Sequence, residues 1–433
     1  MKSDNRLHPV VYLLLFILLA SVLILALPKP ASTMPVFARK YDMSCSTCHS
    51  AYPRLNEFGE QFASDNLRLP NWKNKTVDTG DDMLALPDQV PLALRAQAYV
   101  QAREAEVIDV ETGESTTAET DIQSPYLIKL LSSAPLSENI SYYFYAIFAE
   151  KGGNGEVIVE DAWFSHADVF GSGIGMQLGQ FQVSDLMFPR EVRLTFQDYM
   201  VYRMAGLTYD RGILFDTSAG PVDIALGAVN GNGITDNYTI NSPGYKRPDH
   251  LFDNNNGKAV FGRLGSEIVG TSIGLFGYLG DQMNATGVAG TDSGDRETDK
   301  VSYGVDIAGK IGNKTYWFAQ VLQNDWDEFI DVNTDYSWYG GFVGADYIHS
   351  DRWAYSLLYN YVSADDLRNT DTVYEGIDMN SVTLGATYYF MRNVKGSVEV
   401  NLDLLDTVDQ TGVYYTGHLT GEDYLLLGLD AAF

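Results

Sequence analysis

Residues 90–103, VPLALRAQAYVQAR, alternate between apolar and polar side chains with a period of two. Every even position from Leu92 to Ala102 is apolar, and the odd positions from Arg95 to Arg103 carry Arg, Gln or Tyr. Successive side chains of a β-strand point to opposite faces, so this stretch predicts a strand with one face for lipid and one for water. A strand of a soluble β-sandwich alternates in the same way, so the remaining segments decide between the two folds.

Segments of this kind recur through the rest of the chain. Lengths of about 10 to 15 residues allow tilted strands to cross a membrane. We count sixteen of them, at 90–104, 123–134, 139–150, 156–168, 173–183, 206–218, 220–230, 257–269, 271–282, 300–311, 313–325, 335–348, 351–363, 378–391, 394–406 and 421–433. Residues 86–433 are therefore predicted to form an all-β fold, a transmembrane antiparallel β-barrel of about 16 strands.

The connections between these segments alternate in length. The short ones are 134–138, 171–172, 219, 270, 312, 349–350 and 393. The long ones are 105–122, 184–205, 231–256, 283–299, 326–334, 364–377 and 407–420, and residues 151–155 are a short exception among them. Long outer loops and short periplasmic turns are typical of porins, whereas a sandwich has no reason to sort its loops in this way.

Aromatic residues add two further signs of a barrel. The chain ends in Phe433 on an alternating strand, which resembles the recognition signal of outer-membrane barrel assembly; the same apolar face holds Leu425, Leu427, Leu429 and Ala431. Other aromatic residues lie near predicted strand ends and are expected in the two interfacial girdles. Examples are Tyr336, Trp338, Tyr339, Tyr388, Tyr389 and Phe390.

The composition fits this fold and excludes several others. Of 433 residues, 57 are acidic and 29 are basic, and a formal charge of −28 argues against a nucleic-acid partner, which requires basic patches. Two cysteines are too few for a disulfide framework, and a mean hydropathy of −0.13 excludes a bundle of transmembrane helices. Acid is concentrated in the predicted loops 105–122 and 364–377, which either are simply solvated or attract cations to the pore mouth.

The first 33 residues have the pattern of an export signal. Lys2, Arg6 and His8 precede a nearly unbroken apolar run over residues 10–27. We expect a signal peptide, cleaved near residues 31–34 or after the later VFA sequence at 36–38; an uncleaved membrane anchor is the alternative. In both cases the rest of the chain leaves the cytoplasm, and outer-membrane lipid is its expected surrounding.

The only two cysteines belong to one motif, Cys45-Ser46-Thr47-Cys48-His49. Two thiols at this spacing can each bond one vinyl group of a haem, and the histidine then supplies the proximal nitrogen ligand of the iron. A redox dithiol would need a βαβ context, and a zinc site would need further ligands nearby. Outside the motif no Cys or His occurs between residues 9 and 165, so the motif predicts one covalent haem c.

A short segment after the motif is expected to help bury the haem. Leu55, Phe58 and Phe62 fall at i, i+3 and i+7, on one face of a helix that either forms a local core or covers the haem. The polar stretch 71–82 is expected to be a linker, so the haem segment with its linker spans residues 34–85.

The sixth ligand of the iron is less clear from the sequence. Met83 is the nearest downstream thioether, whereas Met43 lies too close to the motif to reach the opposite face of the ring. His166 and Met187 qualify only if the haem lies against or inside the barrel. Most methionines fill space rather than bind metals.

The long loop after the fifth predicted strand has mixed charge. Its residues 188–195 are FPREVRLT. Such a loop can fold into the lumen and constrict it. Arg190 and Arg193 are expected to line the pore or to pair with Glu191, and contact with haem propionates is the alternative.

These motifs together resemble the fused outer-membrane cytochrome–porins, whose best-described members are iron-oxidising electron conduits of bacteria. The N-terminal likeness runs from Pro35 to Phe62 and includes Phe37-Ala38-Arg39, Met43-Ser44-Cys45, Cys48-His49, Pro53-x-Leu55 and Phe58-Gly59. In the barrel, Gly179-Gln180-Phe181 and Arg190-Glu191-x-Arg193-Leu194-Thr195 are also similar. The specific motifs cover about 40 residues, while the architecture covers the whole chain.

The resemblance implies one covalent haem at or within the barrel mouth. Electrons would pass between an extracellular donor or acceptor and a periplasmic c-type cytochrome, and the resemblance does not imply the direction. With Fe(II) as the expected donor, the chain is expected to be an electron-transfer protein with Fe(II)-oxidising activity. The acidic loops would gather Fe(II) outside. The main alternative is a solute-diffusion porin that carries a structural or vestigial haem, and a third is a surface protein that binds or senses metal.

Overall fold

The computed structural model describes most of the chain after the predicted signal peptide. The described residues are 36–69, 77, 79–81, 84, 86, 91–108, 115–148, 157–231, 257–286, 292–368, 370, 374, 377–405 and 423–433. By its contacts the chain divides into residues 1–33 and 34–433, and every described residue lies in the second unit. The predicted signal peptide, the linker's residues 71–76 and Met83 lie outside the described residues. No described helix is long and apolar enough to cross a membrane.

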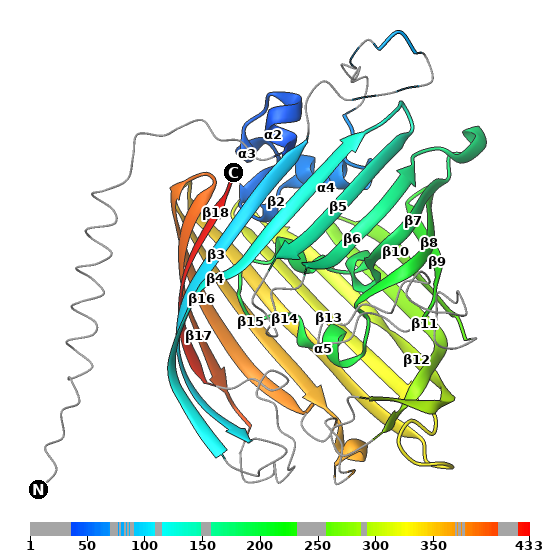
Figure 1. The fold of residues 1–433 in the computed structure, drawn as a ribbon, viewed down its shortest axis with the longest axis vertical. Coiled ribbons are helices and arrows are strands. Elements are labelled where there is room, and N and C mark those ends of the chain that lie inside the picture. Colours follow the sequence, from blue (N-terminus) through cyan, green and yellow to red (C-terminus); the bar gives the residue numbers. More distant parts are fainter. Residues whose placement is uncertain are drawn as a thin grey trace, which may run out of the picture. The chain divides into compact units, whose positions relative to one another are not determined.

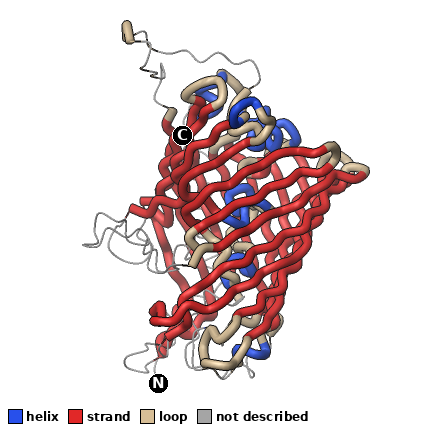
Figure 2. The backbone as a smooth tube through the Cα atoms, turned by 90° about the vertical axis from the view of Figure 1, so that its right-hand side faces the viewer, coloured by secondary structure: helices blue, strands red, loops and turns tan. Residues whose placement is uncertain are grey.

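Sixteen antiparallel strands close into one barrel, as the alternating pattern predicts (Figures 1 and 2). They are β3 (Leu92–Ile108), β4 (Ser115–Pro135), β5 (Ile140–Phe148), β6 (Val157–His166), β7 (Gly175–Gln182), β8 (Tyr209–Ala219), β9 (Val222–Val229), β10 (Ala259–Ile268), β11 (Thr271–Thr286), β12 (Asp292–Ile311), β13 (Thr315–Trp326), β14 (Tyr336–Ser350), β15 (Trp353–Ser363), β16 (Met379–Met391), β17 (Val394–Asp403) and β18 (Tyr424–Ala432). Each strand pairs with its sequence neighbours, and β18 pairs with β3 to close the ring.

The closing strand shows how the two faces differ. On β18, Leu425 and Leu429 are each 42% exposed, and the terminal Phe433 continues this outward face at 43%. Leu426 and Asp430 alternate with them and are buried inside the barrel. A closed ring leaves no unpaired strand edge, which is what a hydrocarbon environment requires of a β-structure.

Two strand pairs extend further than the sequence predicts. The expected loop 105–122 is largely part of the β3–β4 hairpin, which pairs out to Ile108 and Ser115. The expected loop 283–299 is likewise part of the β11–β12 pair, which reaches Thr286 and Asp292. Polar composition indicates solvent exposure but does not prevent backbone pairing, and threonine favours strands. The acidic segments are therefore partly strand rather than loop.

The expectation of interfacial girdles is wrong for three of the named aromatic residues. Tyr336, Trp338 and Tyr389 are 3%, 1% and 5% exposed and face the interior. Tyr339, on the opposite face of β14, is 46% exposed and points outward. Position parity along the strand sets the face of each side chain, and aromatic character alone does not reveal it.

The long segment between β7 and β8 folds into the lumen, as predicted for a constricting loop. It contains the short helices η2 (Val183–Leu186), η3 (Arg190–Val192) and α5 (Met200–Met204), and α5 contacts β14 and β15 (Figure 1). In the closed strand order β15 lies opposite β7, so this segment, residues 183–208, crosses the whole lumen. We call it the crossing loop. Two further short helices, η1 (Val169–Gly171) and η5 (Asp365–Leu367), lie in connections between strands.

The interior of the barrel has an apolar side and a polar side. Buried apolar side chains of β13, β14 and β15, such as Phe318, Phe342 and Leu358, pack against the crossing loop in one large cluster. Charged side chains, among them Lys129 and Asp430, gather on the inner wall formed by β3, β4, β17 and β18. The crossing loop therefore packs as protein core on one side and meets charges on the other.

The residues before the barrel form a small helical segment at the end with the short turns (Figure 1). Its elements are α2 (Val36–Tyr41), α3 (Cys45–Cys48), β1 (His49–Ala51), β2 (Arg54–Leu55) and α4 (Glu57–Ser64). We call residues 36–69 the N-terminal segment. It contacts the barrel at strand ends and turns of this end, through Arg39 to the Leu92 carbonyl, Arg68 to Asn139 and Glu60 to Lys310.

Candidate functional site

A single helical turn brings the two cysteines together. α3 begins after Ser44, whose hydroxyl accepts a hydrogen bond from the Ser46 backbone N–H at 3.3 Å. Residues three apart in a helix lie on the same face, so Cys45 and Cys48 are adjacent. Both are free thiols, and burial raises the pKa of each above its ordinary value. Protonated thiols of this kind do not suit a thiolate redox pair, which needs a lowered pKa.

His49 follows directly, in an extended conformation that ends the turn. Its ring Nδ1 lies 3.0 Å from the Pro53 carbonyl oxygen. A carbonyl oxygen only accepts hydrogen bonds, so Nδ1 carries the proton and Nε2 keeps its lone pair. Burial lowers the pKa of the imidazole and favours the neutral ring. Metal-binding histidines are oriented in this way, by a hydrogen bond from the ring nitrogen that does not bind the metal.

The helix after the motif is held against α3 by a polar side chain and a close backbone approach. Asn56 caps α4 by accepting from the Gly59 N–H at 3.0 Å, and its amide donates to the Thr47 carbonyl at 3.0 Å. A Cβ atom at Gly59 would lie 2.1 Å from the Cys48 carbonyl oxygen. Only glycine fits at that position, so the short spacing between α3 and α4 depends on Gly59.

An open pocket lies beside the motif, where the N-terminal segment meets the barrel. Its lining includes Cys45, His49 and Tyr52 from the N-terminal segment and Asp351, Tyr389 and Arg392 from the barrel. The barrel residues lie on the turn between β14 and β15, the end of β16, and the turn between β16 and β17. The pocket therefore has two sides. One is formed by the N-terminal segment with α3, which carries both thiols, and the other by strand ends and turns of the barrel.

Tyr52 links the motif to the charged wall of the lumen. Its ring centroid lies 5.3 Å from that of His49, and the guanidinium of Arg95 and the ammonium of Lys395 lie 5.4 and 5.7 Å from the Tyr52 ring. The Tyr389 hydroxyl donates to the Tyr52 carbonyl at 2.6 Å. Cations over an aromatic face are attracted to its π-electrons, so these contacts hold Tyr52 in the barrel mouth.

Arg95 and Lys395, the two cations that contact the Tyr52 ring, belong to a larger network of charged side chains. Arg95 forms a two-point ion pair with Asp430, with an Nη2–Oδ2 distance of 2.6 Å, and lies 3.5 Å from Glu191 of the crossing loop. Glu191 also accepts from Lys129 at 3.0 Å and from the Tyr145 hydroxyl at 3.0 Å. The N-terminal segment, the barrel wall and the crossing loop therefore share one chain of charged contacts.

Arg54 anchors the N-terminal segment deeper in the lumen. Its guanidinium pairs with Asp346 of β14, and the two side chains are 11% and 3% exposed. It also lies over the rings of Phe318 and Tyr316, at 5.2 and 5.9 Å from their centroids. A buried pair of opposite charges needs both partners, because either one alone would be an uncompensated charge.

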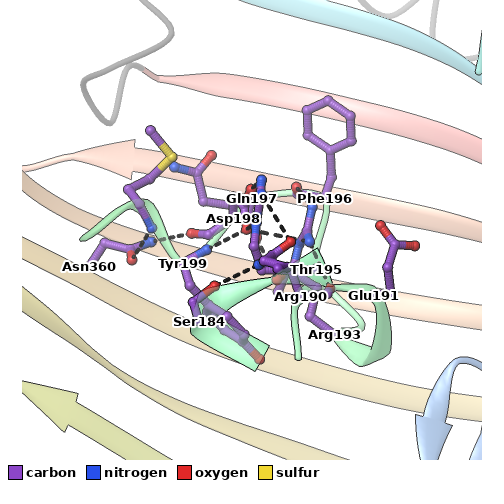
Figure 3. Close-up of polar contacts among 12 residues, drawn as sticks. Ser184, Arg190, Glu191, Arg193, Thr195, Phe196, Gln197, Asp198, Tyr199 and Asn360 are labelled. Atoms are coloured by element: carbon purple, nitrogen blue, oxygen red, sulfur yellow. Dashed lines mark hydrogen bonds and ion pairs between the residues drawn. The ribbon is translucent and has the colours of Figure 1, made fainter. Parts of the chain in front are cut away.

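The crossing loop is held together by a different carboxylate from the one predicted (Figure 3). Arg190 and Arg193 both pair with Asp198, with distances of 2.9 Å for Arg190 Nε to Oδ1 and 3.4 Å for Arg193 Nη1 to Oδ1. The expected pairing with Glu191 is wrong, since Glu191 pairs instead with Lys129 and Arg95 of the wall. Neighbours in an irregular segment point in different directions, so proximity in sequence does not select the partner.

The middle of the crossing loop, residues 196–199, is bonded to the opposite wall. Asn360 of β15 donates to the Asp198 carbonyl at 3.1 Å (Figure 3). Glu399 of β17 accepts from the backbone N–H groups of Phe196 and Gln197 at 2.6 and 2.8 Å. The ring of Tyr199 stacks on Phe342, with 4.3 Å between the centroids. These contacts hold the crossing loop in place across the lumen.

The three residues predicted to form one face of a helix are separated in the structure. α4 begins at Glu57, so Leu55 lies in β2, where it pairs with His49. Phe62 is 5% exposed and packs edge-on against Phe37 and Tyr41, whereas Phe58 is 42% exposed. The helix is shorter than expected because Asn56 caps it. That these side chains cover a haem stays a prediction.

The described candidates for a sixth ligand, His166 and Met187, do not line the pocket beside His49. His166 shares its strand face with Phe164, which is 58% exposed, and therefore points out of the barrel. Met187 is buried in the lumen core, with its sulfur against the Gln320 amide. Met83 lies outside the described residues. Within the described chain, no group of three or more His, Cys, Asp or Glu residues is arranged to hold a metal ion.

Several residues around the site were not singled out from the sequence as candidates. The inward orientation of Arg95 and Asp430 was predictable, because a membrane-spanning strand can place a charged side chain only on its water-facing side. Arg54 and Tyr52 carry no such signal, since their partners Asp346 and Tyr389 are 292 and 337 residues away. Only the closed barrel brings them together.

Comparison with known proteins supports the fold. No protein-family model and no curated protein matches the chain. Solved structures that resemble it include OmpT of Vibrio cholerae in its trimer form, with a TM-score of 0.53, 12% identity, and coverage of 80% of this chain and 99% of OmpT. OmpF of Salmonella typhi has a TM-score of 0.52 and 16% identity over 79% of this chain and 97% of OmpF. The channel DcaP of Acinetobacter baumannii has a TM-score of 0.53 and 12% identity over 79% and 97%.

At these identities the likeness concerns the fold alone, and it extends over nearly the full length of each similar structure. The chain has a porin-type fold, a closed 16-stranded antiparallel β-barrel.

Proposed function

We propose that this protein is an outer-membrane electron-transfer protein that carries one covalent haem c at the periplasmic mouth of its barrel. Electrons would pass between an extracellular partner, with Fe(II) as the expected donor, and a periplasmic c-type cytochrome. The end with the short turns is assigned to the periplasm because porins have short periplasmic turns.

The observation that carries this proposal is the state of the Cys45–His49 motif. Two free thiols share one helical turn, and the imidazole next to them keeps Nε2 for a metal because Nδ1 donates to the Pro53 carbonyl. A small open pocket beside them is lined by both Cys45 and His49. These residues fit a haem c better than a zinc ion, which would need further ligands.

In this proposal the chain's own residues hold and shield the site. Cys45 and Cys48 would supply the two covalent links, and His49 would supply the proximal ligand. The haem, when bound, would contribute a one-electron iron couple. Tyr52 and Arg54 fix the position of the motif in the barrel mouth through Tyr389, Arg95, Lys395 and Asp346.

The interior of the barrel also supports an electron conduit. Water-filled porins have polar lumens. Here the crossing loop spans the lumen and packs its apolar residues against β13, β14 and β15, and Arg54 enters from the periplasmic end. A barrel filled in this way leaves less room for solutes.

A second candidate function is diffusion of solutes, with a haem that is structural or vestigial. The likeness to OmpF and OmpT favours it, since the fold is that of porins. The polar side of the lumen, with Glu191 of the crossing loop 33% exposed, is where a solute path would run. Swelling of proteoliposomes in sugars tests this candidate, because a diffusion porin predicts fast permeation with the haem in place.

The pyridine haemochrome spectrum of the purified full-length protein tests the proposal. We expect a c-type band equivalent to one haem per chain. Cys45→Ser with Cys48→Ser should abolish covalent haem, and His49→Ala should alter the absorption of the iron. His166→Ala is the matched control, because that side chain points outward, and its spectrum should equal that of the unmodified protein. A protein without any c-type band would refute the proposal.

A further inference from the structure

The pocket beside the cysteine motif is lined by residues of the barrel as well as by residues of the N-terminal segment. Asp351 lies on the two-residue turn between β14 and β15, and Arg392 on the turn between β16 and β17. Such turns at the periplasmic end of a barrel usually serve only to connect strands. Here two neighbouring turns, both carrying charge, form the wall opposite Cys45.

Arg392 is the only cation that lines this pocket among the described residues. Its positive charge reaches the motif, since it opposes the effect of burial on the pKa of Cys45. Arg95 and Lys395 contact the Tyr52 ring but do not line the pocket, and both face Asp430. They are therefore already paired, and Arg392 is the cation that a ligand in the pocket would meet.

The present partner of Arg392 holds it weakly. Arg392 Nη2 lies 3.2 Å from Asp351 Oδ2, but the two side chains are 46% and 86% exposed. Ion pairs between exposed side chains contribute little, because water screens them and two flexible side chains must be held still. An anion in the pocket could therefore replace Asp351 at small cost, and a guanidinium binds a carboxylate at two points.

We propose that Arg392 is the barrel's binding residue for the haem, pairing with one of its propionate carboxylates in exchange for Asp351. The inference rests on the proposed haem attachment and deepens it. The cofactor site then belongs to both parts of the chain, because the N-terminal segment supplies the covalent links and the iron ligand while the barrel rim supplies the counter-charge. Docking of the segment on the rim completes the site.

The midpoint potential of the haem in the full-length protein tests this inference. A nearby cation favours the reduced iron, which carries one positive charge less. Arg392→Gln should therefore shift the midpoint potential to more negative values, and Arg392→Lys should restore most of the shift. As a single substitution, Asp351→Asn should shift the midpoint potential to more positive values. In an Arg392→Gln background this effect should shrink, because Asp351 then has no guanidinium to compete for.

Arg352→Gln is the matched control. Arg352 is an exposed arginine beside Asp351 that donates to the Tyr388 hydroxyl at 3.0 Å and does not line the pocket. Its loss should leave the potential unchanged. Equal shifts of the midpoint potential in the Arg392 and Arg352 variants, or no shift in either, would overturn the inference. The proposed function would still stand if the c-type haemochrome band were present. Absence of the band in the unmodified protein would overturn both. Heat-modifiable migration in gels confirms that each variant has a folded barrel.

Discussion

Replacing Arg54 by methionine is expected to loosen the N-terminal segment from the barrel. The change keeps most of the side-chain volume but leaves Asp346 buried without its partner. Removing one member of a buried ion pair costs about 3–5 kcal/mol, which corresponds to roughly a 150- to 4,000-fold change in an equilibrium constant. The penalty acts on the docked state alone, because water can reach Asp346 once the segment has left.

Hydrogen–deuterium exchange of residues 36–69 in the full-length protein measures this effect. The backbone N–H groups of Asn56 and Glu60 are hydrogen-bonded to the Cys48 and Asn56 carbonyls in the docked segment. In Arg54→Met we expect the amides of the segment to exchange faster by roughly 150- to 4,000-fold wherever undocking limits exchange, while the strands of the barrel keep their protection.

Lys310→Gln provides the matched control for the docking contact. Lys310 also links the segment to the barrel, but its Nζ lies 3.6 Å from Glu60 and the two side chains are 37% and 52% exposed. A pair this exposed is worth at most about 1 kcal/mol. If Arg54→Met accelerated exchange no more than Lys310→Gln, the assignment of the Arg54–Asp346 pair as the anchor would be refuted.

Three further changes test the site and the lumen. Gly59→Ala forces α4 away from the Cys48 carbonyl and should destabilise the segment by about 1–3 kcal/mol; unchanged exchange in α4 would contradict the close approach. Cys48→Ser should leave haem on a single link and shift its haemochrome band; an unshifted band would show that Cys48 is not a link. Asp198→Asn removes the charge shared by Arg190 and Arg193, costs about 1.5–3 kcal/mol, and should raise the conductance of planar bilayers, whereas equal conductance would mean that the crossing loop does not limit the path.

The barrel itself was predictable because its two signals are periodic and local. Alternation from residue 90 onward indicates the strands, and tight connections such as 219 and 270 indicate which ends face the periplasm. The structure confirms sixteen strands in the predicted order. The predicted strand ends failed where polar composition alone was taken to indicate a loop. The pairing of Ile108 with Ser115 continues through an acidic stretch, because hydrogen bonding of the backbone does not depend on the charge of side chains.

The site was predictable only as far as it is contiguous in sequence. Cys45 and Cys48 share one turn and His49 follows it directly, so their spacing is enough to bring them together. The partner of Arg54 was not predictable, because Asp346 becomes its neighbour only when β14 takes its place in the closed ring. Arg392 belongs to the same class, since a turn residue far along the chain lines the pocket only after the N-terminal segment has docked.

The most direct test of the account is the response of the haem spectrum to Fe(II) supplied from the long-loop side. The oxidised full-length protein is placed in proteoliposomes with that side outward, and Fe(II) is added to the outer solution. The account predicts that the absorption bands of ferrous haem c appear while sugars permeate slowly, and that the bands develop more slowly in His49→Ala than in His166→Ala. A spectrum that stays oxidised, together with fast permeation of sugars, would contradict the account and leave a diffusion porin in its place.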